Sequence, residues 1–131
     1  MNHHLRIVVL MLGIVCGSAQ KNIDWKTGMS ADDQKATVET NTNVVFKWSG
    51  MKHDVYLFVD KTTYDACDFA KATKLADEAT SGAYSYAAET AGTFYFGCKV
   101  PGHCEGNQKL TLIVTGMFCV WANYFWRAAV I

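Results

Sequence analysis

The sequence predicts an all-β domain of short strands, arranged as a sandwich or a small barrel. Two observations indicate this fold class: apolar and polar residues alternate along several segments, and Gly, Asn and Asp residues separate those segments. A length of 131 residues suits one domain. Lys+Arg and Asp+Glu each number 12, and this balance excludes a strongly basic nucleic-acid binder. We therefore expect no nucleic acid among the partners.

The first two predicted strands are residues 36–40 and 44–49. Along the second, Val44, Phe46 and Trp48 occupy every other position, which is typical of a half-buried strand. Residues 41–43 include two asparagines and predict a turn. We therefore expect the two strands to pair as a hairpin.

Three further strands are predicted along the chain. Residues 55–59 and 93–98 are mainly apolar runs, and Gly92 precedes the second run. In residues 110–115 the Leu, Leu and Val at even positions would face one side, and the Thr, Ile and Thr the other. This alternation predicts a strand that buries one face.

Residues 62–80 interrupt the β pattern because they are rich in Ala, Lys, Asp and Glu. Thr62 with Asp65 resembles a capping box, which marks the start of a helix. Gly82 can end the helix that starts there. The sequence therefore predicts a short helical excursion between two β segments.

Residues 1–19 are predicted to form a signal peptide that is cleaved after Ala19. Arg6 and the amino terminus supply positive charge, residues 7–15 are apolar, and the three residues before the cut are small. The apolar run is far shorter than the ~20 residues that a membrane-spanning helix needs. Cleavage predicts a secreted protein and removes Cys16. The alternative is that this run is a buried helix or strand.

Residues 117–131 form a hydrophobic C-terminal tail of unknown role, which includes Cys119. Three interpretations stay open: a degenerate membrane or anchor signal, an interfacial helix, and an extension without function. The first of these would attach the protein to a membrane. The predicted domain between the two ends, residues 20–116, has 12 acidic and 10 basic residues and thus a net charge of −2.

The predicted domain contains two histidines and three cysteines: His53, His103, Cys67, Cys98 and Cys104. In an oxidising compartment, three thiols can form one disulfide and leave one sulfur unpaired. A free thiol that survives there is usually buried or bound to a metal ion. The parity of the cysteines therefore indicates one protected sulfur.

Residues 98–108 contain a cysteine, a histidine and a glutamine within one short segment. Cys98 ends a predicted strand, His103 lies in a tight loop, and Gln108 begins the next strand. A loop of this size can bring a thiolate, an imidazole and an amide oxygen around one ion. His53, at the start of another strand, could complete the set.

Two histidines, one cysteine and a weak axial oxygen are the ligand type of a blue-copper electron-transfer site. Thiolate and imidazole together tolerate both Cu(I) and Cu(II), and a weak fourth ligand avoids a strong preference for either. Little rearrangement then accompanies the transfer of one electron. An amide oxygen in place of a thioether should favour Cu(II) and lower the reduction potential.

The sequence resembles the phytocyanin family of cupredoxins, and its stellacyanin-like members in particular. The resemblance is carried by residues 43–48, 51–67 and 92–114, and it covers most of the chain from about residue 38 to residue 115. Its most specific part is the pattern Cys-x₄-His-Cys-x₃-Gln, in which Gln108 stands where stellacyanins have their axial glutamine.

This resemblance implies a Greek-key β-sandwich with one copper ion at one end, and a secreted or cell-surface location. It implies that His53, Cys98 and His103 are equatorial copper ligands and that Gln108 is the axial one. It also implies a disulfide between Cys67 and Cys104, since phytocyanins pair the cysteine that adjoins the second histidine ligand.

Two alternatives remain open for the cysteines. A disulfide between Cys98 and Cys104 would cross the loop and leave Cys67 unpaired. Cys98 and Cys104 could instead join both histidines in a zinc site, although structural zinc usually takes pairs of ligands at short spacing, and His53 has no such neighbour.

We expect a secreted or cell-surface type 1 (blue) copper protein that carries single electrons between redox partners. Those partners would be a protein or a small-molecule electron donor or acceptor, and we expect the protein itself to be a monomer. No nucleophile–base pair is recognisable, so we do not expect an enzyme. The alternative is a non-redox cell-surface binding or structural module on the same fold, with copper or zinc incidental.

Overall fold

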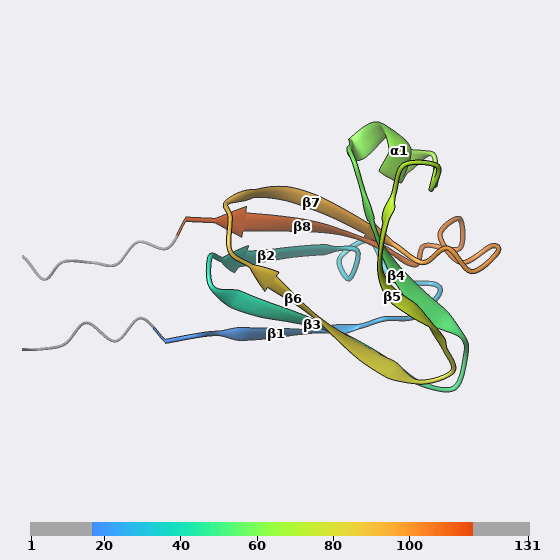
Figure 1. Cartoon of the computed structure of the whole chain (residues 1–131), viewed down its shortest axis with the longest axis horizontal. Coiled ribbons are helices and arrows are strands. Elements are labelled where there is room, and N and C mark those ends of the chain that lie inside the picture. The colour runs from blue at the N-terminus through green and yellow to red at the C-terminus, as the bar shows by residue number, and fades with distance from the viewer. Residues whose placement is uncertain (1–16, 117–131) are drawn as a thin grey trace, which may run out of the picture.

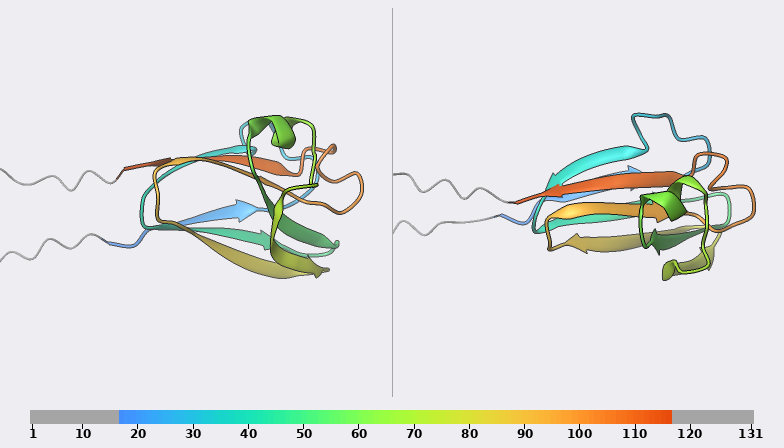
Figure 2. Two further views of the ribbon diagram at one scale, coloured as in Figure 1. Left: turned by 45° about the horizontal axis from the view of Figure 1, so that its top comes forward. Right: turned by 90° about the horizontal axis from the view of Figure 1, so that it is seen from above.

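The computed structural model describes residues 17–116, which fold into two facing β-sheets and one short helix (Figure 1). One sheet has the strand order β1-β3-β6 and the other β2-β8-β7-β4-β5, and Figure 2 shows the two layers. The expected all-β sandwich with a short helix is confirmed. The elements are β1 Gln20–Asp24, β2 Lys35–Glu39, β3 Thr42–Trp48, β4 His53–Phe58, α1 Lys61–Asp65, β5 Thr73–Ala79, β6 Gly82–Ala88, β7 Gly92–Gly97 and β8 Lys109–Thr115.

Residues 1–16 and 117–131 lie outside the described part. Most of the predicted signal peptide, the C-terminal tail, Cys16 and Cys119 therefore have no structural account here. The described residues include no helix with the length and hydrophobicity that a membrane span requires.

The predicted hairpin of residues 36–40 and 44–49 is wrong, although both strands exist. β2 pairs with β8 in parallel, whereas β3 lies in the other sheet between β1 and β6. The turn between them carries the chain from one sheet to the other, with Asn41 in a left-handed conformation (φ 67°). Alternation shows which face of a strand is buried but does not name its partner.

The predicted helix of residues 62–80 is also wrong beyond its first turn. Only Lys61–Asp65 is helical, and Thr73–Ala79 forms β5, an edge strand paired with β4. The helix starts earlier than expected: Asp60 is the N-cap, and its carboxylate accepts a hydrogen bond from the Thr63 backbone N–H at 2.8 Å. Cys67 then takes a positive φ of 50°, which a continuing helix cannot contain.

Gly82 begins β6 rather than ending a helix. A Cβ at this position would lie 2.5 Å from the Trp48 ring on the paired strand, closer than side-chain atoms approach. The Trp48 indole N–H donates to the Ala79 carbonyl at 2.9 Å, so the ring lies over the turn between β5 and β6. The glycine is thus required by close packing at a strand start.

The sandwich core, formed by the inner faces of the two sheets, consists of interlocking apolar side chains. Phe46 is at its centre, with ring centroids 5.1 Å from Trp25 and 5.0 Å from Phe96. The expected alternation of residues 110–115 is confirmed, because the even positions are buried and the odd ones are not. The buried members are Ile23, Trp25, Met29, Ala36, Val38, Val44, Phe46, Trp48, Val55, Ala88, Phe96, Cys98, Leu110, Leu112 and Val114.

A second apolar group, here called the outer cluster, is formed by α1, the chain that follows it, β4, β7 and the loop after β7. Its buried members are Phe58, Tyr64 and Cys104, and Cys67, Phe69, Ala72 and Tyr95 pack against them. A disulfide joins Cys67 to Cys104, which confirms the pairing that the family resemblance implied. The outer cluster therefore connects the helical turn to the loop that carries His103.

Candidate metal centre

The candidate ligands lie at one end of the sandwich, three of them beside strand ends and His103 within a loop. His53 is the first residue of β4, and Cys98 directly follows β7. His103 and Gln108 belong to the loop of residues 98–108 that joins β7 to β8, drawn in orange at the right of Figure 1. Residues 45 positions apart in sequence are thereby brought to one place by the pairing of β4 with β7.

Three potential ligand atoms lie close together at this end. The two histidine Nδ1 atoms, of His53 and His103, are 3.1 Å apart. The Cys98 sulfur is 3.9 Å from Nδ1 of His53 and 3.5 Å from Nδ1 of His103. Within residues 17–116, this is the one group of three or more Cys, His or acidic side chains close enough to hold a metal ion.

The spacing of the three atoms fits one ion of ordinary size. Bonds of about 2.0 Å to imidazole nitrogen and about 2.3 Å to thiolate sulfur place donor atoms about 3–4 Å from one another around a common ion. All three distances fall in this range. A donor set of two imidazoles and one thiolate suits copper and zinc better than the hard cations magnesium and calcium.

The Gln108 side chain is completely buried, and neither of its amide atoms has a hydrogen-bond partner. Its main chain is bonded to two of the other candidates: the Gln108 N–H donates to the His103 carbonyl at 2.9 Å, and its carbonyl accepts from the Cys98 N–H at 3.1 Å. A buried amide without partners costs free energy. An ion coordinated by the amide oxygen would remove part of that cost.

Burial keeps the two inner candidates uncharged when no metal is bound. Burial raises the pKa of the Cys98 thiol to about 12. Burial also lowers the pKa of His53, and the nearby His103 lowers it further. A neutral imidazole is ready to bind a metal, whereas Cys98 must first lose its proton.

Asp54 joins the two ligand-bearing strands at the point where they separate. β4 and β7 pair as far as Tyr56 and Gly97, and the same register continued would place Asp54 opposite Lys99. The strands part there, and the Asp54 carboxylate accepts a hydrogen bond from the Lys99 backbone N–H at 2.7 Å. The Trp25 indole N–H donates to the Asp54 carbonyl at 2.9 Å and holds it from the other side. Asp54 therefore links β4 to the chain after β7 beside the candidate ligands His53 and Cys98, and we call it the strand brace.

The contact between Asp54 and Lys99 was not expected from the sequence. Asp54 is a carboxylate directly between His53 and the apolar run of residues 55–59, and that placement is the one signal the sequence offers. It is nearly buried, with 7% of its surface exposed. Its bond to Lys99 crosses 45 residues of sequence, and no local pattern predicts such a contact.

The disulfide settles both alternatives for the cysteines. Cys104 is bonded to Cys67, and Cys98 is the free cysteine of the described residues. A bridge between Cys98 and Cys104 is therefore excluded. A zinc site that includes Cys104 is excluded as well, because its sulfur is already in a covalent bond.

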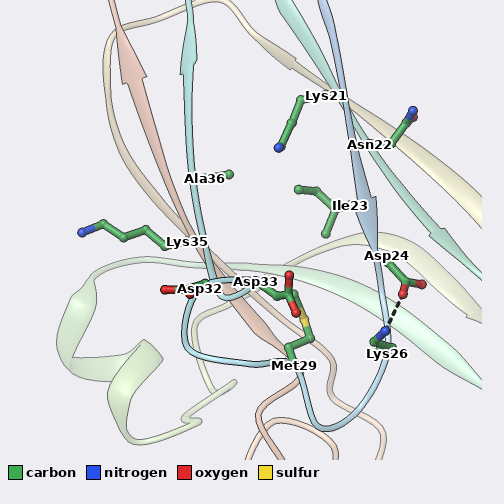
Figure 3. A pocket seen from close by; sticks show the side chains of 10 residues that line it. All are labelled: Lys21, Asn22, Ile23, Asp24, Lys26, Met29, Asp32, Asp33, Lys35 and Ala36. Atoms are coloured by element: carbon green, nitrogen blue, oxygen red, sulfur yellow. Dashed lines mark hydrogen bonds and ion pairs between the residues drawn. The ribbon is translucent and has the colours of Figure 1, made fainter.

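A groove of about 140 Å³ lies elsewhere, between the edge strands β1 and β2 (Figure 3). Ile23, Met29 and Ala36 form its apolar part. Its charged part mixes three lysines with three aspartates, of which Lys26 and Asp24 pair at 2.6 Å. Because the positive and negative side chains balance, the groove favours neither an anion nor a cation. None of the candidate metal-binding residues lines it.

Residues 22–108 match a family model described as a plastocyanin-like domain. Uclacyanin-2 of Arabidopsis thaliana is 32% identical over 111 residues, which is 82% of this chain and 52% of the relative. The chain belongs to the phytocyanin family. Early nodulin-like protein 14 of the same plant is 33% identical over 100 residues, or 72% of this chain and 53% of the relative. This phytocyanin thus spans about half the length of the curated relatives it matches.

Solved structures show the same fold. Cucumber stellacyanin in its Cu²⁺ form superposes with a TM-score of 0.64 at 22% identity, over 77% of this chain and 99% of that one. Spinach plantacyanin gives 0.54 at 24% identity, over 74% and 100%. Phytocyanins as a family are blue copper electron-transfer proteins rather than enzymes, and they are extracellular or cell-surface proteins.

Proposed function

We propose that this phytocyanin binds one copper ion and carries single electrons between redox partners. His53, Cys98 and His103 would be the equatorial ligands, and Gln108 the axial ligand through its side-chain oxygen. The observation that carries the proposal is the convergence of the two Nδ1 atoms and the thiol sulfur within 4.8 Å of one another. The unpartnered amide of Gln108 supports the fourth position.

Copper would supply a one-electron couple between Cu(I) and Cu(II), and the protein would keep the ligands in place for both. His53 and Cys98 are buried at the ends of paired strands, which excludes water and limits movement. The disulfide at Cys104 restrains the neighbouring His103. Rigid, largely dry ligands reduce the rearrangement that accompanies a change of oxidation state.

His103 is the ligand best placed for electron exchange with a partner. It is partly exposed, whereas His53 and Cys98 are buried, and the adjacent Pro101 and Gly102 are exposed. A partner protein or small molecule would therefore approach this end of the molecule. We expect the protein to act as a monomer.

The processing scheme stays a proposal as well. Residues 1–19 would be a signal peptide, residues 20–116 the cupredoxin domain, and residues 117–131 a hydrophobic tail that could attach the domain to a membrane. Cleavage after Ala19 would leave β1 whole, because this strand begins at Gln20. The protein would then be secreted or held on the extracellular side of the plasma membrane.

Absorption and voltammetry of the purified protein test the function. With Cu(II), the wild type should turn intensely blue through thiolate-to-copper charge transfer and show a reversible one-electron potential. Cys98→Ser should abolish the colour, since the thiolate is lost. Gln108→Met should keep the colour and raise the potential, because a thioether favours Cu(II) less than an amide oxygen does.

Two results would contradict the proposal. A protein that binds zinc but forms no blue copper complex would favour the non-redox module. An unchanged potential in Gln108→Met would remove Gln108 from the ligand set while leaving the other three in place.

A further inference from the structure

The loop that carries His103 and Gln108 ends in a Schellman motif. The Asn107 N–H donates to the Cys104 carbonyl at 3.0 Å, and the Gln108 N–H donates to the His103 carbonyl at 2.9 Å. These are the two hydrogen bonds that define the motif, with Asn107 in the position that requires a left-handed backbone. Asn107 does have a left-handed φ of 67°. The hydrogen bond from Gln108 to His103 therefore joins the main chains of the two candidate ligands of this loop.

Asn107 is the point at which the loop reverses into β8. The next residue, Gln108, already pairs with Cys98 through its carbonyl, and Lys109 is the first residue of the strand. On the other side, the Gly106 carbonyl accepts a hydrogen bond from the Gly28 N–H at 2.7 Å, which fixes the peptide plane before Asn107. A change of backbone conformation at Asn107 would have to move Gln108, because the preceding peptide is held.

The identity of this residue matters because few residue types accept a left-handed backbone. Glycine does so freely and asparagine readily, whereas a β-branched side chain is strongly disfavoured. The side chain of Gln108 is fully buried, and neither of its amide atoms has a hydrogen-bond partner, so no side-chain hydrogen bond determines where the amide lies. The position of the amide therefore follows from the backbone of Gln108 and from packing.

We propose that Asn107 is a positioning residue, whose left-handed backbone sets where the Gln108 amide lies relative to His53, Cys98 and His103. The proposal rests on the proposed function, in which Gln108 is the axial ligand. It adds a residue that contacts no metal and acts only through the main chain.

The chain offers a matched control at the opposite end of the sandwich. Asn41, in the turn between β2 and β3, has the same residue type and the same φ of 67°. Its N–H donates to the Ala88 carbonyl at 2.9 Å, far along β3 from the end that leads to His53. Valine at either site imposes a similar backbone strain, but only one site adjoins the candidate ligands.

The test compares Asn107→Val, Asn107→Gly and Asn41→Val in the full protein. In the metal-free protein, Asn107→Val should speed amide hydrogen exchange at Gln108 roughly tenfold, and Asn107→Gly should leave it near the wild-type rate. With Cu(II), Asn107→Val should shift the electron paramagnetic resonance spectrum and the reduction potential. Asn107→Gly and Asn41→Val should retain both, even where Asn41→Val lowers the melting temperature. If Asn107→Val does not fold, Asn107→Ala takes its place.

Three outcomes would overturn the inference. Wild-type exchange and copper spectra in Asn107→Val would show that the left-handed backbone does not place Gln108. An equal spectral change in Asn107→Gly would assign the effect to the asparagine side chain, and one in Asn41→Val would assign it to general strain. Because the exchange experiment needs no metal, a wild type that failed to bind copper would refute the proposed function and leave the test of Asn107 intact.

Discussion

The sandwich core and the outer cluster are held together by different means. The sandwich core has fifteen buried residues from both sheets and the segments that adjoin them, and its aromatic rings touch on several sides. The outer cluster has three, and they lie under one helical turn and a loop. Such a small group buries little apolar surface, so packing alone would hold the helical turn and the loop after β7 only weakly. The disulfide between Cys67 and Cys104 adds a covalent link between these two segments.

The difference extends to the candidate metal ligands. Cys98 belongs to the sandwich core, whereas His103 adjoins Cys104 of the outer cluster. One ligand is therefore held by packing within a large core, and another by a covalent bond outside it. Substitutions in the two regions should affect stability and the metal site in different proportions.

The largest effect is expected from truncation of the sandwich core. Phe46→Ala should lower the free energy of unfolding by about 4 kcal/mol, because it leaves a cavity among several rings. Phe58→Ala, the same change in the outer cluster, should cost less, since Phe58 has ring contacts with Tyr64 and Phe69, whereas Phe46 has three such contacts. Urea denaturation of both variants measures the difference. Equal losses would mean that the outer cluster is packed as firmly as the core.

The next effect concerns the disulfide. The double variant Cys67→Ala/Cys104→Ala opens a loop with a sequence separation of 37 and should lose about 3.5–4 kcal/mol of stability on the chain-entropy estimate. Copper affinity should fall more than in a core variant of equal stability, because His103 is released while Cys98 stays buried. Copper titration alongside urea denaturation checks this. Unchanged affinity would show that the loop hydrogen bonds suffice to hold His103.

A smaller effect is expected at the strand brace. Asp54→Ala removes the acceptor of the Lys99 N–H and should cost about 1–3 kcal/mol. Asp54→Asn keeps a carbonyl oxygen at the same position and should cost less. Amide exchange at Lys99 in the metal-free protein reports the bond directly. If Asp54→Ala leaves that exchange slow, another group satisfies the Lys99 amide.

The last effect is absent at neutral pH and appears only at high pH, where Cys98 of the sandwich core can titrate and the disulfide-bonded cysteines of the outer cluster cannot. The pKa of Cys98 is raised from 9.0 to about 12, so the folded metal-free protein holds this proton more tightly than the unfolded chain. This contribution to stability is complete below pH 9 and is lost as the pH rises from about 9 towards 12. Cys98→Ala should show a shallower decline over this window, as measured by thermal unfolding, while oxidised Cys104 contributes nothing. An identical decline would assign the effect to other groups, such as Tyr64 and Tyr86, whose pKa values are also raised by burial.

Elements that depend on neighbouring residues follow from the sequence, whereas elements that depend on distant partners do not. The strand of residues 110–115 follows from the sequence because its alternation is local and strong. Residues 62–80 do not, because composition favours a helix while Thr73–Ala79 gains more by pairing with β4. Tertiary pairing of this kind overrides weak propensities. The disulfide between Cys67 and Cys104 was predicted from the family resemblance and not from the spacing of the cysteines.

What the sequence by itself determined is the β class and the ligand-bearing loop of residues 98–108, because both depend on neighbours a few positions apart. Only the tertiary structure decided which strands pair, that the Asp54 carboxylate bonds to the Lys99 backbone, and that Asn107 is left-handed next to Gln108. The physical reason is that strand partners and cross-strand hydrogen bonds join residues far apart in sequence, and a periodic pattern carries no record of which distant segment will meet it.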